Sequence, residues 1–164
     1  MWKHRVKSDN FLVEITGGSV KITDINSDEL IKIFKGYNYL YTGDIRPDEA
    51  EFFALENGKH FYVYSLKDFE LIKKITLPKR YESLYVNGFY SEDGKFLNIP
   101  AERYVYDDKA RDIGHCEFIL FKYETDNYEL VEKTKIENYK KYHWNYVIQD
   151  GVWYSGGFDK EIIF

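Results

Sequence analysis

The chain has 164 residues, a formal net charge of −5, and 44% hydrophobic, 31% charged and 19% aromatic residues. This length fits one compact domain over residues 1–164, and the apolar and aromatic content excludes an intrinsically disordered chain. The acidic balance argues against nucleic-acid binding, and the lack of any apolar run of about 18 residues argues against a membrane span.

The composition favours strands over helices, because 16 tyrosines and 12 phenylalanines stand against only four alanines. Taken in chain order, the alternation of apolar and polar residues predicts fifteen short strands in four groups. The first two groups cover 2–6, 11–16, 20–25 and 30–35, then 38–45, 51–56, 60–66 and 71–77. The last two cover 84–90, 96–101, 116–123 and 130–136, then 144–148, 152–156 and 161–164. At Pro47–Gly58 a helix is the alternative, since proline and acids begin this segment and Asn-Gly ends it.

A sequence repeat underlies these groups. The segments Val20–Ile33, Tyr62–Ile75 and Phe118–Val131 align, and each has the pattern strand, acidic turn, strand. Leu71 follows Leu30 by 41 residues and Leu130 follows Leu71 by 59, and we attribute the excess to an insertion loop at about 101–115. A period of about 40 residues with four antiparallel strands is the size of one propeller blade.

Two segments carry a resemblance to a known family. Ser91-Glu-Asp-Gly-Lys-Phe-Leu97 resembles the turn of WD40-like and related bacterial β-propeller repeats, and Tyr64–Leu71 resembles their outer hairpin. The resemblance implies an all-β, propeller-like domain of about four blades. The last blade is incomplete, because fifteen strands are one short of four blades of four. An open β-meander or a barrel built from the same hairpins is the alternative.

The propeller expectation sorts the loops onto two faces. The hairpins within blades are rich in acids such as Asp9, Glu29 and Asp48, whereas the connections between blades and the insertion carry tyrosines and basic residues. Tyrosine, tryptophan and arginine dominate the binding energy of interfaces. The predicted binding residues are Tyr37, Lys79, Arg80, Tyr81, Arg103, Tyr104, Tyr106, Tyr139, Lys140, Tyr142, His143 and Trp144. The competing interpretation is that these tyrosines pack the ends of the blades.

The sequence shows no arrangement of residues typical of catalysis or metal binding. Four histidines are scattered singly, and Cys116 is the one cysteine, so neither a disulfide, a metal nor a cofactor is expected. We predict that Cys116 is buried, because free cysteine is among the most buried residue types. A hydrolase acting on carbohydrates or small molecules would have to use Asp107, Asp108, His115 or His143.

These observations favour a non-enzymatic binding module that recognises a protein partner carrying acidic groups. The alternatives are a hydrolase on the same face, and a structural subunit whose incomplete last blade is filled by a partner strand or by a second copy. With one cysteine and no apolar leader, a cytoplasmic location is expected.

Overall fold

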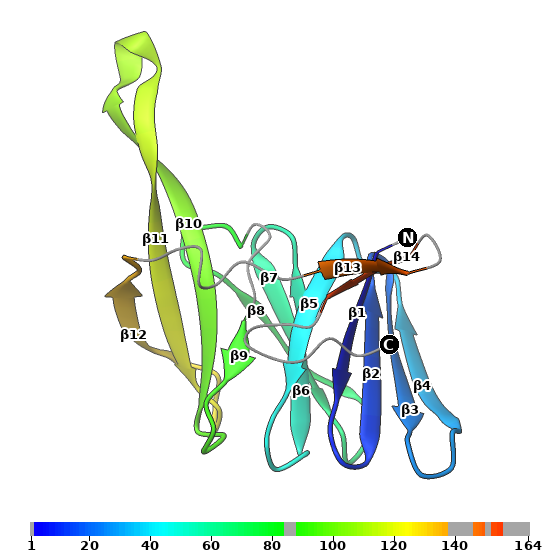
Figure 1. Cartoon of the computed structure of the whole chain (residues 1–164). Coiled ribbons are helices and arrows are strands. Elements are labelled where there is room, and N and C mark those ends of the chain that lie inside the picture. Colours follow the sequence, from blue (N-terminus) through cyan, green and yellow to red (C-terminus); the bar gives the residue numbers. More distant parts are fainter. Residues whose placement is uncertain (1, 84–87, 138–145, 150–151, 156–164) are drawn as a thin grey trace.

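The computed structural model describes residues 2–83, 88–137, 146–149 and 152–155 (Figure 1). Within these ranges the chain is all-β, and its one helical element is the short 3₁₀ turn η1 (Lys109–Arg111). No helix in the described part of the chain is long and apolar enough to cross a membrane.

Twelve of the strands form three antiparallel units of four consecutive strands each. The first sheet contains β1 (Trp2–Lys7), β2 (Phe11–Thr16), β3 (Ser19–Asp24) and β4 (Leu30–Lys35). The middle sheet contains β5 (Leu40–Ile45), β6 (Glu51–Glu56), β7 (His60–Ser65) and β8 (Leu71–Thr76). The third sheet contains β9 (Phe89–Tyr90), β10 (Phe96–Asp108), β11 (Ile113–Glu124) and β12 (Leu130–Lys135). The described sheets do not close into a barrel, and segment 51–56 is a strand rather than a helix.

The sequence repeat corresponds to a repeat of hydrogen-bond register. Leu30, Leu71 and Leu130 each begin the fourth strand of a unit, and in each unit the pairing with the third strand shifts just after this leucine, where one residue of the fourth strand is skipped. Two residues before each leucine stands a residue with positive φ, namely Asp28, Phe69 or Tyr128. Three hairpins of different sequence therefore share one backbone conformation.

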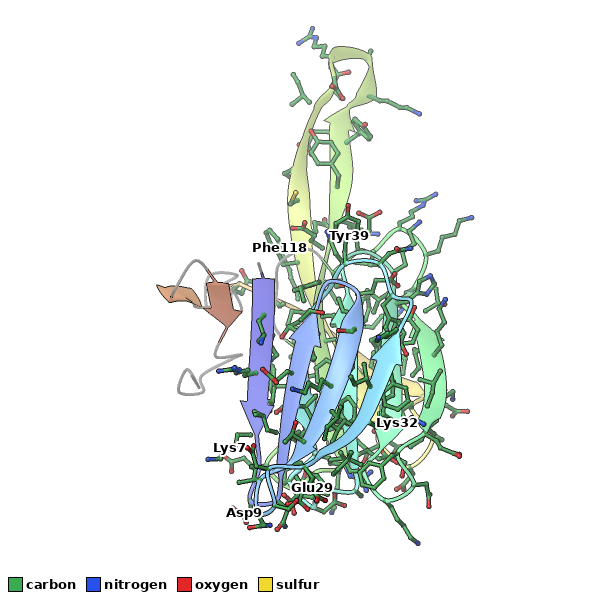
Figure 2. The ribbon with its side chains drawn as sticks, turned by 90° about the vertical axis from the view of Figure 1, so that its right-hand side faces the viewer. Lys7, Asp9, Glu29, Lys32, Tyr39 and Phe118 are labelled. Carbon is green, nitrogen blue, oxygen red and sulfur yellow. The ribbon has the colours of Figure 1, made fainter. Side chains whose placement is uncertain are left out.

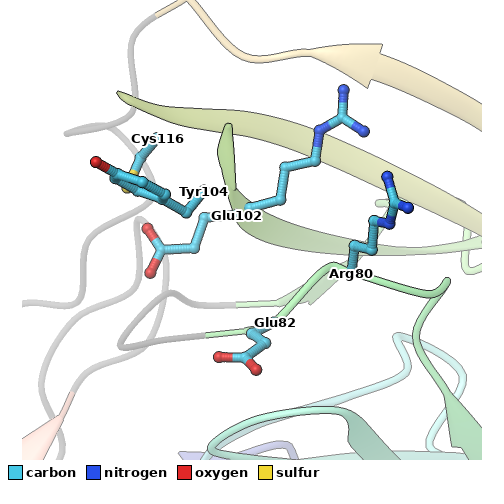
Figure 3. Close-up of a pocket in the computed structure, with 6 residues that line it drawn as sticks. Arg80, Glu82, Glu102, Tyr104 and Cys116 are labelled. Carbon is cyan, nitrogen blue, oxygen red and sulfur yellow. The ribbon is translucent and has the colours of Figure 1, made fainter. Parts of the chain in front are cut away.

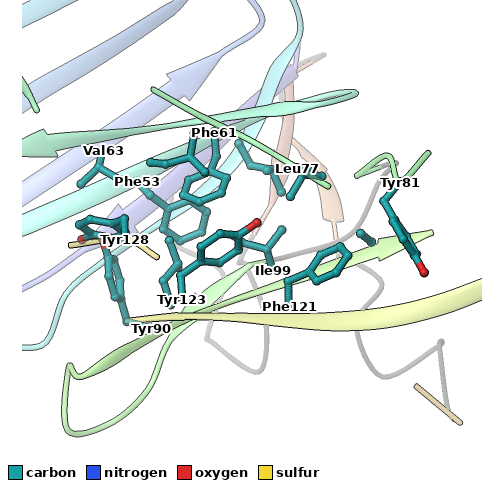
Figure 4. Packing of buried hydrophobic residues seen from close by; sticks show 14 of the residues in the cluster. Phe53, Phe61, Val63, Leu77, Tyr81, Tyr90, Ile99, Phe121, Tyr123 and Tyr128 are labelled. Carbon is teal, nitrogen blue, oxygen red and sulfur yellow. The ribbon is translucent and has the colours of Figure 1, made fainter. Parts of the chain in front are cut away.

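The middle sheet has a hydrophobic core on each face, because side chains alternate along a strand. In β6, Phe52 and Ala54 pack against the first sheet, whereas Phe53 and Leu55 pack against the third. Figure 4 shows the second of these cores, where Phe53 meets the ring of Tyr90 edge-on at 5.6 Å. The three sheets consequently pack as successive layers, in which β5, β6 and β7 of the middle sheet are buried while β8 is largely exposed.

Buried polar groups tie the layers together. The Nε2 of His4 in β1 lies 2.9 Å from the carbonyl oxygen of Gly43 in β5, and the Asp44 carboxylate accepts a hydrogen bond from the Tyr90 backbone at 3.0 Å. The phenolic oxygen of Tyr128 bonds to both Tyr90 and Glu51 and so joins the third sheet to the middle one. These bonds fix how neighbouring sheets are placed against each other.

The last hairpin differs from the expected fourth unit. Strands β13 (Tyr146–Gln149) and β14 (Val152–Ser155) extend the first sheet, and β14 pairs in parallel with β1. In the described residues this hairpin is therefore not a separate sheet. The strand expected at 161–164 lies outside the described residues. Of the strand expected at 84–90, residues 88–90 are described, and Phe89–Tyr90 form a strand.

Candidate interaction surface

The prediction of an insertion loop at 101–115 is wrong. This segment is a two-stranded β-ribbon, formed by the end of β10, the turn η1 and the beginning of β11. The pairing of β10 with β11 continues without a break from Phe96↔Glu124 to Tyr106↔Gly114, and ends at Asp108↔Ile113. Beyond Arg103 the described part of the chain adds no third strand to this pair. Figures 1 and 2 show the ribbon rising well clear of the three sheets.

The tip of the ribbon is closed by side-chain capping. The Asp108 carboxylate accepts hydrogen bonds from the backbone of Ala110 at 3.1 Å and Arg111 at 3.3 Å, and Asp112 takes a left-handed conformation with φ 54°. Aspartate suits this position because its short carboxylate bonds the backbone two residues onward. Asp108 therefore closes the turn.

Two tyrosines occupy one face of the ribbon. The rings of Tyr104 and Tyr106 meet edge-on with centroids 5.0 Å apart, and each side chain is 50% exposed. Opposite them stands Gly114, where an added Cβ would lie 2.7 Å from the Tyr104 ring. This glycine lets the Tyr104 ring lie against the backbone of the neighbouring strand.

The other face carries a row of charged groups. Both Nε and Nη2 of Arg103 donate to Oε2 of Glu117, at 2.9 and 2.8 Å, and the Nδ1 of His115 lies 2.9 Å from the Asp107 carboxylate. The remaining nitrogen of His115 lies 3.7 Å from Glu117, which links the two pairs. Arg103 lowers the pKa of Glu117, and the hydrogen bond to the Asp107 carboxylate raises the pKa of His115.

The base of the ribbon rests on the core. The guanidinium of Arg103 lies 5.2 Å from the centre of the Tyr81 ring, which in turn meets Phe121 edge-on at 5.0 Å. Tyr81 is thus buried, and Tyr37 packs on Tyr62 in the other core. Tyr81 and Tyr37 were predicted to bind a partner, but they pack against the two cores, as the competing interpretation of the sequence expected.

A hollow of about 390 Å³ lies at the base of the ribbon, beside the segment 77–83 that follows β8 (Figure 3). Its lining consists of Arg80, Glu82, Glu102, Arg103, Tyr104 and Cys116. Burial and the nearby Glu82 carboxylate raise the pKa of Glu102. The hollow is therefore of mixed charge, whereas the sequence pattern indicated a basic face.

The structure brings together Arg80, Arg103, Tyr104 and Tyr106 of the predicted set, with exposed Lys79 close by in the chain. The predicted Tyr139, Lys140, Tyr142, His143 and Trp144 lie outside the described residues. The prediction for Cys116 is wrong, because its side chain is exposed beside Tyr104. Glu82, Glu102 and Glu117 were not predicted, although reading 101–117 as a hairpin would have placed Glu117 opposite Arg103.

The acidic hairpins gather at the opposite end of the molecule, where Figure 2 labels Asp9 and Glu29. They bond to one another, as when the Asn10 amide donates to the Glu49 carboxylate at 2.7 Å. In the part of the chain that the structure describes, no three histidine, cysteine or acidic side chains are grouped so as to hold a metal ion.

No family model and no curated protein matches the chain. Among solved structures, a hydrazine synthase from Kuenenia stuttgartiensis is similar, with a TM-score of 0.58 and 19% sequence identity. The similarity covers 82% of this chain but only 36% of that one. At this level of identity the comparison concerns the fold alone.

Proposed function

We propose that the chain is a non-enzymatic protein-interaction module that binds its partner through the β-ribbon and the hollow at its base. One observation carries the proposal: Tyr104, Tyr106 and Ile113 are each 50% exposed on a two-stranded hairpin outside both cores. An isolated hairpin of two strands is only marginally stable in water, and exposed aromatic groups together commonly mark binding sites. A partner that covers these side chains would account for both features.

The proposal includes a propeller-like arrangement of the sheets. Three consecutive units of four antiparallel strands share one register and pack face to face, as the blades of a propeller do. In such an arrangement the ribbon extends the second and third strands of one blade beyond its neighbours.

Charge favours a partner that carries acidic groups. Glu117 already neutralises Arg103, but within the described residues neither Lys79 nor Arg80 has a carboxylate at ion-pair distance. Exposed charges of this kind contribute to orientation and association rate more than to affinity. We therefore place the acidic group of the partner beside Arg80.

The test replaces the two exposed tyrosines and keeps a matched control. The double variant Tyr104→Thr, Tyr106→Thr preserves strand propensity. The control Leu71→Thr, Ile72→Thr changes two residues of similar exposure on β8, which belongs to the middle sheet and not to the ribbon. Proteins captured from a host lysate are identified and then titrated in purified form. We expect the tyrosine variant to lose at least about tenfold in affinity, because aromatic anchors dominate interfaces.

Equal affinity of the two double variants for the captured protein would contradict the proposal. Both variants must keep the far-ultraviolet circular dichroism spectrum and the unfolding midpoint of the unmodified chain, so that lost binding reflects the surface and not the fold.

A hydrolase is the second candidate, and the hydrogen bond between His115 and Asp107 favours it. A histidine oriented by a carboxylate can act as a general base. However, the two other groups that a hydrolase could use are placed elsewhere. Cys116 lies beside Tyr104 on the opposite face of the ribbon from His115, and the Asp108 carboxylate is bonded to the backbone of the turn at the tip. Turnover of ester or glycoside substrates that Asp107→Asn abolishes would support this candidate.

A further inference from the structure

The edge of β10 at the hollow already accepts one short strand. The backbone N–H of Glu82 donates to the Glu102 carbonyl at 2.9 Å, and the N–H of Glu102 donates to the Glu82 carbonyl at 2.8 Å. The backbone groups of Glu102 therefore point away from β11 and toward this edge. Because these directions alternate along a strand, the N–H and C=O groups of Tyr104 and Tyr106 point to the same edge.

The segment 77–83, which follows β8, turns away from this edge before it would pair with the backbone groups of Tyr104 and Tyr106. Continued antiparallel pairing from Glu82↔Glu102 would set Arg80 opposite Tyr104 and Pro78 opposite Tyr106. Instead, Tyr81 N–H donates to the Pro78 carbonyl at 3.1 Å in a turn, and Arg80 takes a φ of +76°. A positive φ is uncommon for arginine, so this single residue diverts the chain from the ribbon.

The diversion leaves room beside the open edge. A second hollow of about 330 Å³ is lined by Arg80, Arg103, Tyr104, Val105 and Tyr106. Within the described residues, no backbone group of Tyr104 or Tyr106 receives a strand partner at this edge. Unpaired strand edges are templates for pairing with another chain.

We propose that an extended segment of the partner protein adds as a strand to the edge of β10 at Tyr104 and Tyr106, continuing the line that Glu82 begins. This inference rests on the proposed function and specifies how the partner is held. Main-chain hydrogen bonds would supply affinity, and alternate side chains of the added strand would supply specificity.

The side chains around the hollow define the segment that fits. In Figure 3 the carboxylates of Glu82 and Glu102 lie on one side and the Arg80 guanidinium on the other. An acidic side chain is favoured beside Arg80 and disfavoured near the two glutamates. The segment therefore has strand-forming residues, with an acidic residue at the Arg80 end.

The experiment separates backbone pairing from side-chain contact. Tyr106→Pro removes the outward N–H but no bond to β11, since Tyr106 and Gly114 face each other without exchanging hydrogen bonds in this alternation. Tyr106→Val removes the same ring, keeps the N–H and is the matched control. The probe is a displayed library of random peptides of about twelve residues, selected on the unmodified chain and remeasured as synthetic peptides.

We expect selected peptides to be strand-forming with an acidic residue, and to bind Tyr106→Pro at least about tenfold more weakly than Tyr106→Val. Hydrogen exchange on the unmodified chain, which needs no variant to fold, should show the amides of Tyr104 and Tyr106 protected only when the peptide is bound. Equal binding to both variants, no protection of these amides, or no selected peptide would overturn the inference.

The outcomes also separate this inference from the proposed function. If Tyr104→Thr, Tyr106→Thr loses the captured partner but Tyr106→Pro binds it as Tyr106→Val does, the module binds through side chains and strand addition is wrong. If the purified chain alone protects these amides with rising concentration, the added strand comes from a second copy, and the partner peptide is wrong.

Discussion

The tripeptide Tyr-Val-Tyr occurs twice in this chain, once in the middle sheet and once in the ribbon. Tyr62 and Tyr64 in β7 are 8% and 0% exposed, whereas Tyr104 and Tyr106 in β10 are each 50% exposed. Both copies lie in antiparallel strands with a neighbour on at least one side. The local sequence therefore specifies the strand but does not specify whether its tyrosines are core or surface.

The difference arises from the layers around each strand. Tyr64 stacks on Phe52 with centroids 4.6 Å apart and also contacts Phe34 at 4.7 Å, so residues from the first and middle sheets enclose it. In the described part of the chain, the rings of Tyr104 and Tyr106 contact each other, and the Tyr104 ring also lies against Gly114. A sheet buried on both faces needs apolar side chains in both directions. Within the described residues, no second layer of strands packs on the end of the ribbon that carries Tyr104 and Tyr106.

The largest difference between the two copies of Tyr-Val-Tyr is expected when one tyrosine of each copy is truncated to alanine. Tyr64→Ala should lower the free energy of unfolding by about 3–5 kcal/mol, because it removes a large aromatic group from a packed core. Tyr106→Ala should leave the urea unfolding midpoint unchanged. Similar midpoints for the two variants would show that the ribbon is part of the cooperative core.

A smaller effect is expected at the polar contact between the middle and third sheets. Tyr128→Phe removes the hydroxyl that bonds to Tyr90 and Glu51, and should cost about 1–3 kcal/mol because buried polar partners are left unsatisfied. Tyr104→Phe, which removes an exposed hydroxyl, is the control. Equal unfolding midpoints for both variants would mean that this contact does not hold the sheets together.

The smallest effect concerns the charged face of the ribbon. Asp107 raises the pKa of His115, so its pairing with protonated His115 is present below the ordinary histidine pKa and is lost as pH rises through the raised value. Asp107→Asn should shift the His115 titration to lower pH, as followed by nuclear magnetic resonance of its ring. An unchanged titration would exclude Asp107 as the cause.

Much of the fold could be predicted, because strands, turns and the sequence repeat are determined by short stretches of neighbouring residues. The strands at 11–16, 30–35 and 51–56 have the predicted bounds, and the alignment of Leu30, Leu71 and Leu130 is confirmed by their shared register. The site was harder to predict, because Tyr37 and Tyr81 have the same residue type as Tyr104 and differ only in what packs on them.

The sequence by itself determined that this chain is all-β, with hairpins in a repeat, because alternation, Asp-Gly turns and the scarcity of alanine act over a few residues. Only the tertiary structure decided that 101–115 continues two strands as a ribbon, and that the connection turns away at Arg80, so that no described strand pairs with the edge of β10 at Tyr104 and Tyr106. These features depend on which layers lie against each strand, and such contacts join residues far apart in the chain.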